Sequence, residues 1–188
     1  MSIVLASASP RRAELLHAAG FAFTVEPVDV DESVLPGESP ETYVRRLACA
    51  KAQAGAARLP GRTVLGADTI VVIDGQILGK PRDDAEAAGM LAALSGRVHH
   101  VYTAVAVTNG RVVCDDVDVS AVSFGALTPE DVAAYVASGE PRDKAGAYAI
   151  QGRASRFVQR LEGSYSGVVG LPVAVVHRLL ISLRQDHE

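Results

Sequence analysis

The sequence predicts an α/β protein in which a mixed, twisted sheet is flanked by helices. Three observations predict this class: short apolar runs alternate with helical patterns early in the chain, turn dipeptides join β-rich segments later, and helix-start signals recur throughout. The length of 188 residues suits one domain, over residues 1–188, with a sizeable buried core. We therefore expect strands and helices to alternate first and hairpins to dominate afterwards.

The first part of the chain carries clear helix boundaries between its apolar runs. Polar residues precede proline at two helix starts, and a glycine follows the first helix. The expected elements are a strand over 3–6, a helix over 10–19 closed by Gly20, a strand over 21–28, and a helix from Pro40, capped by Ser39, to about Arg58.

The rest of the chain is expected to contain hairpins separated by helices. Asp-Gly and Asn-Gly pairs between β-rich arms are strong hairpin signals, and Asp or Thr before a helical pattern is a capping signal. The expected features are a strand arriving at Gly66-Ala67-Asp68, turns at Asp74-Gly75, Asn109-Gly110 and Glu162-Gly163, helices started by Asp83 and Thr128, and a last helix from Pro172.

Composition and charge exclude several classes of protein. A hydrophobic fraction of 48%, with 21% charged residues, is ordinary for a globular chain. The net charge of −4 argues against binding a long nucleic acid through a broad basic surface. No apolar run has membrane-spanning length, and the first is too short for a signal peptide. With only two scattered cysteines, Cys49 and Cys114, we expect a cytoplasmic protein without membrane association.

Two arginines stand in the first turn of the first expected helix. Ser9 and Pro10 mark the start of that helix, and Arg11 and Arg12 follow immediately. The helix dipole is positive at this end, so each cation there is unfavourable by a few tenths of a kcal/mol. An anion bound at this helix end would explain the arrangement.

A lysine interrupts the apolar stripe of the second helix. Val44, Leu47 and Ala48 form the stripe, and Lys51 lies seven residues after Val44, where another inward-facing position is due. The stem of Lys51 can pack on apolar neighbours while its amine reaches water. The alternative is that the amine serves a charged site.

Carboxylates at two places are candidates for metal binding. Asp68 follows an apolar run and should be partly buried, which requires a metal, a cation or a hydrogen-bond donor as partner. Asp29, Asp31 and Glu32 lie in one acidic loop. Together with Asp68 they could hold Mg²⁺ or Mn²⁺, which prefer carboxylate and water oxygens. The alternatives are a turn-capping aspartate and a solvated acidic loop.

Two further side chains suit a nucleotide ligand. Lys80 stands in a turn fixed by Pro81, so its amine is either held over a cleft or simply solvated. Gln151 lies in a glycine-rich loop whose backbone can approach a flat ligand, and its amide offers a donor and an acceptor to a base edge.

His99 and His100 are neighbours in the sequence and should point to opposite faces of a strand, so they cannot jointly bind one metal.

Eight segments of the chain carry a resemblance to a known family. They are, in order, LASASPRRAELL, DVDES, RRLACAKA, GADTIVV, ILGKP, LSGRVHHVYTAVAV, SGEPRDKAGAYAIQG and VVGLP. In one register and over nearly the whole chain, they resemble the Maf family of nucleoside triphosphate pyrophosphatases. It implies a Maf/ITPase-like fold of two lobes with a deep cleft, usually in a homodimer, and metal-dependent hydrolysis of a nucleoside triphosphate to the monophosphate and pyrophosphate.

The resemblance also assigns roles residue by residue. It places phosphate contacts at one group of side chains, which are Ser7, Arg11, Arg12, Lys51 and Lys80. It makes Glu32 and Asp68 the ligands of a divalent cation, Mg²⁺ or Mn²⁺, with Asp68 also the favoured general base, and it puts Gln151 on the nucleotide-recognition loop. The AGAYAIQG form resembles the subgroup acting on dTTP and UTP, although Ala149 stands where that subgroup usually has glycine.

Two other functions remain open at this point. A nucleotide-sensing regulator of cell division would bind the same ligand without turnover. A pyrophosphatase for modified purine triphosphates such as ITP would need Gln151 and its loop to read a different base edge.

Overall fold

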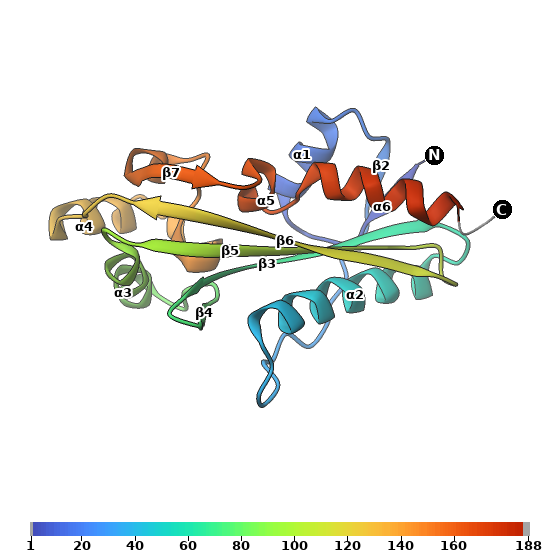
Figure 1. Cartoon of the computed structure of the whole chain (residues 1–188), viewed down its shortest axis with the longest axis horizontal. Helices are drawn as coiled ribbons and strands as arrows, with labels where there is room; N and C mark the ends of the chain where they lie inside the picture. Colours follow the sequence, from blue (N-terminus) through green and yellow to red (C-terminus); the bar gives the residue numbers. More distant parts are fainter. Residues whose placement is uncertain (1, 186–188) are drawn as a thin grey trace. The chain divides into compact units, whose positions relative to one another are not determined.

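The computed structural model describes residues 2–185 and confirms the mixed α/β class (Figure 1). The elements of the first part are β1 Ile3–Leu5, α1 Pro10–Ala18, β2 Phe23–Val25, α2 Pro40–Arg58, β3 Thr63–Ile73, β4 Gln76–Leu78, α3 Asp84–Leu94 and β5 Val98–Thr108. They are followed by β6 Val113–Phe124, α4 Pro129–Ala137, the 3₁₀ turns η1 Glu140–Asp143, η2 Ala145–Ala147 and η3 Arg153–Phe157, β7 Val158–Glu162, α5 Tyr165–Val169 and α6 Val173–Gln185.

The described strands form one mixed sheet. Their order is β2-β1-β3-β5-β6-β7, with β4 pairing separately with β3. β1 runs parallel to both β2 and β3, whereas β4 is antiparallel to β3 and β7 is antiparallel to β6. None of the described helices combines the length and apolar character that a membrane crossing requires.

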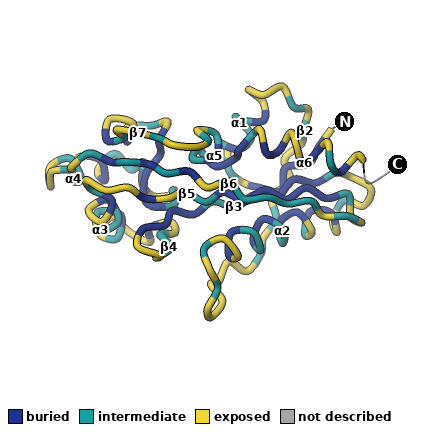
Figure 2. Tube along the Cα trace, viewed as in Figure 1, coloured by how far each residue is buried: buried dark blue, intermediate teal, exposed yellow. Residues whose placement is uncertain are grey.

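The chain divides into two compact units, each with its own apolar core. The first unit comprises the described parts of 1–68 and 170–188 together with Thr103–Asp118, and the second comprises Thr69–Tyr102 and Val119–Val169. In the first, α1 and α6 pack on β1, β3 and β5; in the second, α3 and α4 pack with β3, β5, β6 and the 3₁₀ turns. Figure 2 shows the buried residues concentrated along the strands.

Local capping explains why the helix starts were predictable. The Ser39 hydroxyl accepts the N–H of Thr42 at 3.2 Å, and the Asp83 carboxylate accepts that of Glu86 at 2.8 Å. Thr128 and Asp131 form a complete capping box at α4. These bonds satisfy orphan N–H groups in the first turn, and they depend only on residues close in sequence.

Two sequence expectations are corrected by the structure. Asp68 does not end a strand, because β3 continues through it to Ile73. The expected hairpin at Glu162-Gly163 is wrong. Strand β7 ends there against β6, and the Ser164 hydroxyl then accepts the N–H of Gly167 at 3.0 Å to start the short helix α5.

Candidate functional site

Lys51 joins the two carboxylates that the sequence singled out. Its Nζ lies 2.7 Å from Oδ1 of Asp68 and 2.7 Å from Oε1 of Glu32. The side chains of Lys51 and Asp68 are each 11% exposed, whereas that of Glu32 is 52% exposed. The inward position predicted for Lys51 is therefore confirmed, and its amine serves a charged cluster rather than bulk water.

Close packing of α2 on β3 places Lys51 opposite Asp68. Gly66 allows this approach, because a Cβ there would lie 2.3 Å from the carbonyl oxygen of Ala48 and 2.5 Å from the nitrogen of Ala52. Asp68 follows two residues later on the same face of β3, and Lys51 precedes Ala52 on the helix. A larger residue at position 66 would separate the ion pair.

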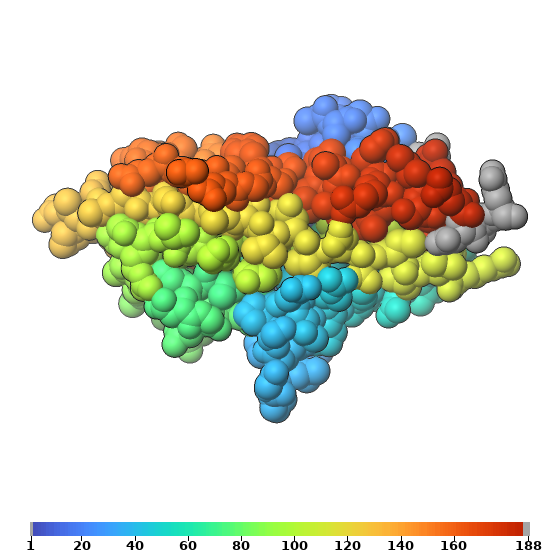
Figure 3. All heavy atoms as spheres, viewed as in Figure 1, coloured from blue at the N-terminus to red at the C-terminus, as the bar shows by residue number. Residues whose placement is uncertain are grey.

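Two side chains of α2 hold the loop that carries Glu32. The Tyr43 hydroxyl donates to the carbonyl oxygen of Glu32 at 2.8 Å. Arg46 binds both carboxylate oxygens of Glu38, at 2.7 and 2.8 Å, and the carbonyl oxygen of Ser33 at 2.9 Å. Figure 3 shows this loop, in light blue, projecting from the surface. Sequence reasoning missed Tyr43 and Arg46, although Tyr43 precedes Lys51 by two helical turns and so shares its face.

Arg12 is buried and is held by three acceptors of the protein. Its Nε donates to the carbonyl oxygen of Gly170 at 2.9 Å, and its Nη1 donates to that of Ala67 at 2.8 Å and to Oγ of Ser7 at 3.0 Å. Burial lowers the pKa of the Arg12 guanidinium; the charge of Asp68 opposes this shift and that of Arg11 adds to it. Arg12 thus fixes the backbone next to Asp68.

The start of α1 lies beside this arginine. Ser9 occupies the N-cap position, yet its side chain does not cap the helix; instead its N–H donates to Oγ of Ser7 at 3.2 Å. Pro10 is the first helical residue, and the first turn contains no acidic side chain. The expected helix start is confirmed, and the N–H groups of this turn together with Arg11 favour an anion.

The residues present fit a divalent cation. Glu32 and Asp68 converge on a cation, the ammonium of Lys51, and their oxygens are ligands that Mg²⁺ and Mn²⁺ prefer. Within residues 2–185 no group of three or more His, Cys, Asp or Glu is placed to hold a metal. The chain would thus supply two carboxylates, and substrate phosphates and water would complete the shell, as is usual for Mg²⁺.

The remaining two candidates belong to the second unit. Lys80 is exposed in the irregular segment after β4, next to the buried Pro81. Gln151 is exposed and follows the buried residues Tyr148, Ala149 and Ile150.

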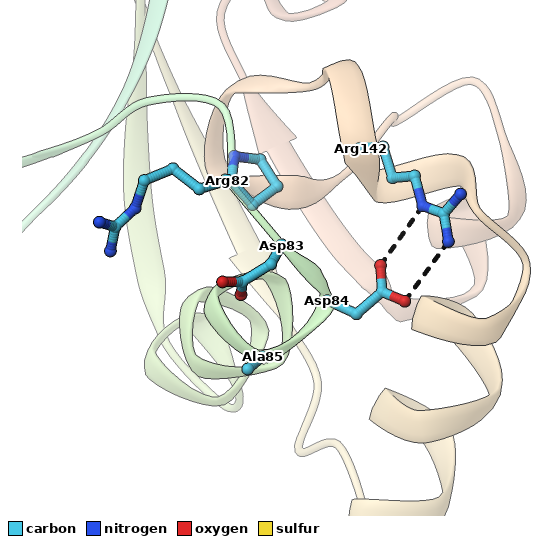
Figure 4. Close-up of a pocket in the computed structure, with 6 residues that line it drawn as sticks. Arg82, Asp83, Asp84, Ala85 and Arg142 are labelled. Atoms are coloured by element: carbon cyan, nitrogen blue, oxygen red, sulfur yellow. Dashed lines mark hydrogen bonds and ion pairs between the residues drawn. The ribbon is translucent and has the colours of Figure 1, made fainter.

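A pocket in the second unit lies near Lys80 but has the wrong chemistry for a triphosphate. It is lined by Pro81, Arg82, Asp83, Asp84, Ala85 and Arg142 (Figure 4). Arg142 reaches Asp84 at 3.3 and 3.4 Å, and Nε of Arg82 binds Glu86 at 3.0 Å. The lining has two arginines and two aspartates, so it offers a triphosphate no excess of positive charge.

Comparison with known proteins identifies the family. A family model described as Maf-like protein matches residues 2–183. The chain belongs to the Maf family. All eight sequence-predicted site residues of this Maf chain lie inside the matched region.

Close relatives and one solved structure complete the comparison. A dTTP/UTP pyrophosphatase of Shewanella denitrificans is 52% identical over 100% of this chain and 99% of that protein. One of Moorella thermoacetica is 54% identical over 95% of this chain and 93% of that protein. The structure of the Staphylococcus aureus Ham1 protein aligns over 100% of both chains at 14% identity, with a TM-score of 0.54, which supports the fold alone.

Proposed function

We propose that this Maf protein hydrolyses dTTP and UTP to the nucleoside monophosphate and pyrophosphate. One observation carries the proposal: Lys51 forms ion pairs with both Glu32 and Asp68, so the three side chains make one charged cluster. The negative charges of the two carboxylates also favour the charged form of Arg12 at the start of α1. Such a cluster combines groups that bind phosphate with a carboxylate that can accept a proton. The names of relatives about half identical to this chain support the choice of substrate.

The start of α1 is proposed to bind the phosphates. Arg11 and the first N–H groups of the helix offer positive charge and hydrogen-bond donors. Ser7 accepts bonds from Ser9 and Arg12, so its own hydroxyl proton remains suited to donation to a phosphate oxygen. Lys51 and Lys80 are proposed to add positive charge along the triphosphate.

Asp68 is proposed to act as general base. Its carboxylate accepts a proton from a water molecule, whose oxygen forms a bond to the α-phosphorus. The bond from this phosphorus to the oxygen bridging the β-phosphate breaks, and the electron pair leaves with pyrophosphate. The arginines and lysines stabilise charge that builds up on the phosphate oxygens in the transition state.

We propose that Glu32 and Asp68 hold Mg²⁺ or Mn²⁺ during this reaction. Bound there, the cation would neutralise phosphate charge and polarise the oxygens it touches. Lys51 supplies one positive charge against the two negative charges of Glu32 and Asp68. A further cation is needed there, because the carboxylates would otherwise repel the triphosphate of the substrate. Removal of divalent metal with a chelator is therefore expected to abolish turnover, and added Mg²⁺ or Mn²⁺ to restore it.

We further propose that the enzyme works as a homodimer in the cytoplasm, as the family resemblance implies. Light scattering coupled to gel filtration is expected to give about twice the chain mass of 19.6 kDa. A mass equal to that of one chain would overturn the dimer.

The decisive experiment measures pyrophosphate release from dTTP, UTP, CTP, GTP, ITP and 7-methyl-GTP with Mg²⁺ or Mn²⁺. We expect dTTP and UTP to be the best substrates of the wild type and Asp68→Asn to lose turnover. Asp116→Asn is the matched control, because Asp116 is a half-exposed carboxylate of the same unit that pairs with Arg178. Binding without turnover would overturn the enzyme in favour of a nucleotide sensor.

A further inference from the structure

The backbone around Gln151 is bonded on both sides to one pair of side chains. The N–H of Ala149 donates to the hydroxyl of Tyr135 at 3.2 Å, and that hydroxyl donates to Oε1 of Glu140 at 2.8 Å. The N–H of Arg153 donates to Oε2 of the same carboxylate at 3.1 Å. Two residues before and two residues after Gln151, the chain is therefore tied to a single Tyr135–Glu140 pair, which we call the clamp.

The clamp is well packed as well as bonded. Tyr135 is fully buried, and its ring packs edge-on against Phe157 with the centroids 5.5 Å apart. Burial, and then the bond to Glu140, raises the pKa of the Tyr135 hydroxyl, so this hydroxyl keeps its proton and donates. Gly152 lets the carboxylate approach the backbone, because a Cβ there would lie 2.3 Å from Oε1 of Glu140.

A separate contact anchors the residue that precedes the clamped segment. The Tyr148 hydroxyl lies 2.8 Å from Nε2 of His99, and the ring of Tyr148 packs edge-on against that of Phe124 with the centroids 4.8 Å apart. Tyr148, Ala149 and Ile150 are buried, whereas Gln151 is exposed. The segment thus presents one polar side chain from a fixed backbone.

We propose that Tyr135 and Glu140 are positioning residues that hold Gln151 and thereby set the selectivity for the pyrimidine base. This inference rests on the proposed function. The amide oxygen of Gln151 can accept a hydrogen bond from N3–H of uracil or thymine while its NH₂ donates to O4. Turned over, the same amide can donate to N3 of cytosine and accept from its N4 amino group. A fixed backbone holds the amide at one place in the site, where the groups around it favour one of its two orientations over the other.

The first test compares kcat/KM for UTP and CTP in wild type, Tyr135→Phe and Glu140→Gln. Because both substrates meet the same enzyme preparation, a loss of folded protein cancels from the ratio. We expect the UTP preference to fall about tenfold in both variants, mainly through the KM for UTP. Tyr165→Phe and Glu130→Gln are matched controls, because Tyr165 and Glu130 are exposed residues of the same unit, and both should keep the wild-type ratio.

The second test needs no substrate. Hydrogen exchange followed by NMR should show the amide of Ala149, whose acceptor is the Tyr135 hydroxyl, exchanging at least about tenfold faster in Tyr135→Phe than in Tyr165→Phe. Wild-type exchange at this amide, or a wild-type UTP/CTP ratio in both clamp variants, would overturn the clamp. If the wild type hydrolyses no nucleotide, the proposed function and the selectivity role fail together, while the exchange rates still decide whether the clamp holds the segment.

Discussion

Lys51 balances the charge of two carboxylates that would otherwise repel each other. Its side chain and that of Asp68 are each 11% exposed, so both charges are largely removed from water. Losing one partner of such a pair leaves the other buried without compensation, which is more costly than losing both.

Lys51→Met is therefore expected to lower the free energy of unfolding by about 3 kcal/mol. The methionine side chain keeps the apolar stem but removes the ammonium. The double variant Lys51→Met/Asp68→Asn should recover most of the loss, because the buried carboxylate of Asp68 is then neutralised as well. The carboxylate of Glu32 remains, but it is 52% exposed and therefore solvated. Urea unfolding of the wild type, the two single variants Lys51→Met and Asp68→Asn, and the double variant at neutral pH measures this. Equal losses in Lys51→Met and in the double variant would contradict it.

His99 is a second buried polar side chain. It is 0% exposed; its Nε2 meets the Tyr148 hydroxyl, while its Nδ1 has no hydrogen-bond partner. Burial, assisted by the charge of His100, lowers the pKa of His99 from its usual value near 6.5 to about 4. In the folded protein this ring is therefore neutral at pH 5, whereas in the unfolded chain it is protonated.

The unfolded state binds the extra proton between pH 6.5 and pH 4, so stability should fall as pH falls through this window. From pH 7 to pH 5, His99 should account for about 2 kcal/mol of the loss. Urea unfolding at both values should show a smaller loss in His99→Phe than in wild type. His177→Gln, at an exposed position on α6, is the control and should keep the wild-type loss. An unchanged loss in His99→Phe would rule out this origin.

The sequence could predict which single residues were unusual, but not what they contact. The helical spacing from Val44 identified Lys51 as inward-facing, and the first-turn position identified the arginines as misplaced. Their partners lie on other elements: Lys51 meets a loop and a strand, and Arg12 meets the carbonyl oxygens of Ala67 and Gly170. No local rule links such distant positions. The sequence grouped Glu32 with Asp68 as cation ligands, but the place of Lys51 between them became visible only in the folded chain.

At the level of elements, the contact between α2 and β3 depends on one glycine. A Cβ at Gly66 would overlap the backbone of α2, not a flexible side chain. Helix and strand would have to separate, and this would disturb the bond from Lys51 to Asp68. Gly89, by contrast, lies exposed within α3, and a Cβ there meets nothing within 4 Å.

Gly66→Ala is expected to lower the free energy of unfolding by about 3 kcal/mol and to reduce turnover. Gly89→Ala, the same chemical change inside a helix, is expected to raise it by roughly 0.5–1 kcal/mol without affecting turnover. Thermal and urea unfolding of both variants provide the comparison. Similar small effects at the two positions would mean that the strand can move away from the helix at little cost.

Element boundaries were predictable where local bonds set them. Ser39, Asp83 and Thr128 accept N–H groups of the next turn, and all three helices begin where the sequence predicted. Asp68 was misjudged as a strand end because a carboxylate is unusual within a buried strand. The strand continues through Asp68, and Lys51, a residue of another element, compensates its charge.

At the level of the whole molecule, the two compact units are not separated by a linker. Their boundary falls inside the long strands: β3, β5 and β6 each have residues in both. For this reason the composition of the sequence does not change at the boundary between the two units, and the boundary could not be predicted from it. Each still has a core of its own, with Leu16 of α1 in the first and Leu91 of α3 in the second, both 0% exposed.

We expect the two units to unfold in one transition, because a strand that loses its order in one unit cannot keep its hydrogen-bond register at the start of the other. The five tyrosines report mainly on the second unit, since only Tyr43 belongs to the first and the chain has no tryptophan. Near-ultraviolet tyrosine signals and far-ultraviolet circular dichroism should therefore give coincident urea transitions.

Matched core variants test this coupling. Leu16→Ala and Leu91→Ala should each lower the free energy of unfolding by about 2–5 kcal/mol. If the units are coupled, Leu16→Ala shifts the tyrosine transition as far as it shifts the far-ultraviolet one, although most tyrosines lie in the other unit. A tyrosine transition that stays at its wild-type midpoint in Leu16→Ala, but moves in Leu91→Ala, would show instead that each core unfolds separately and that the shared strands transmit little of the loss.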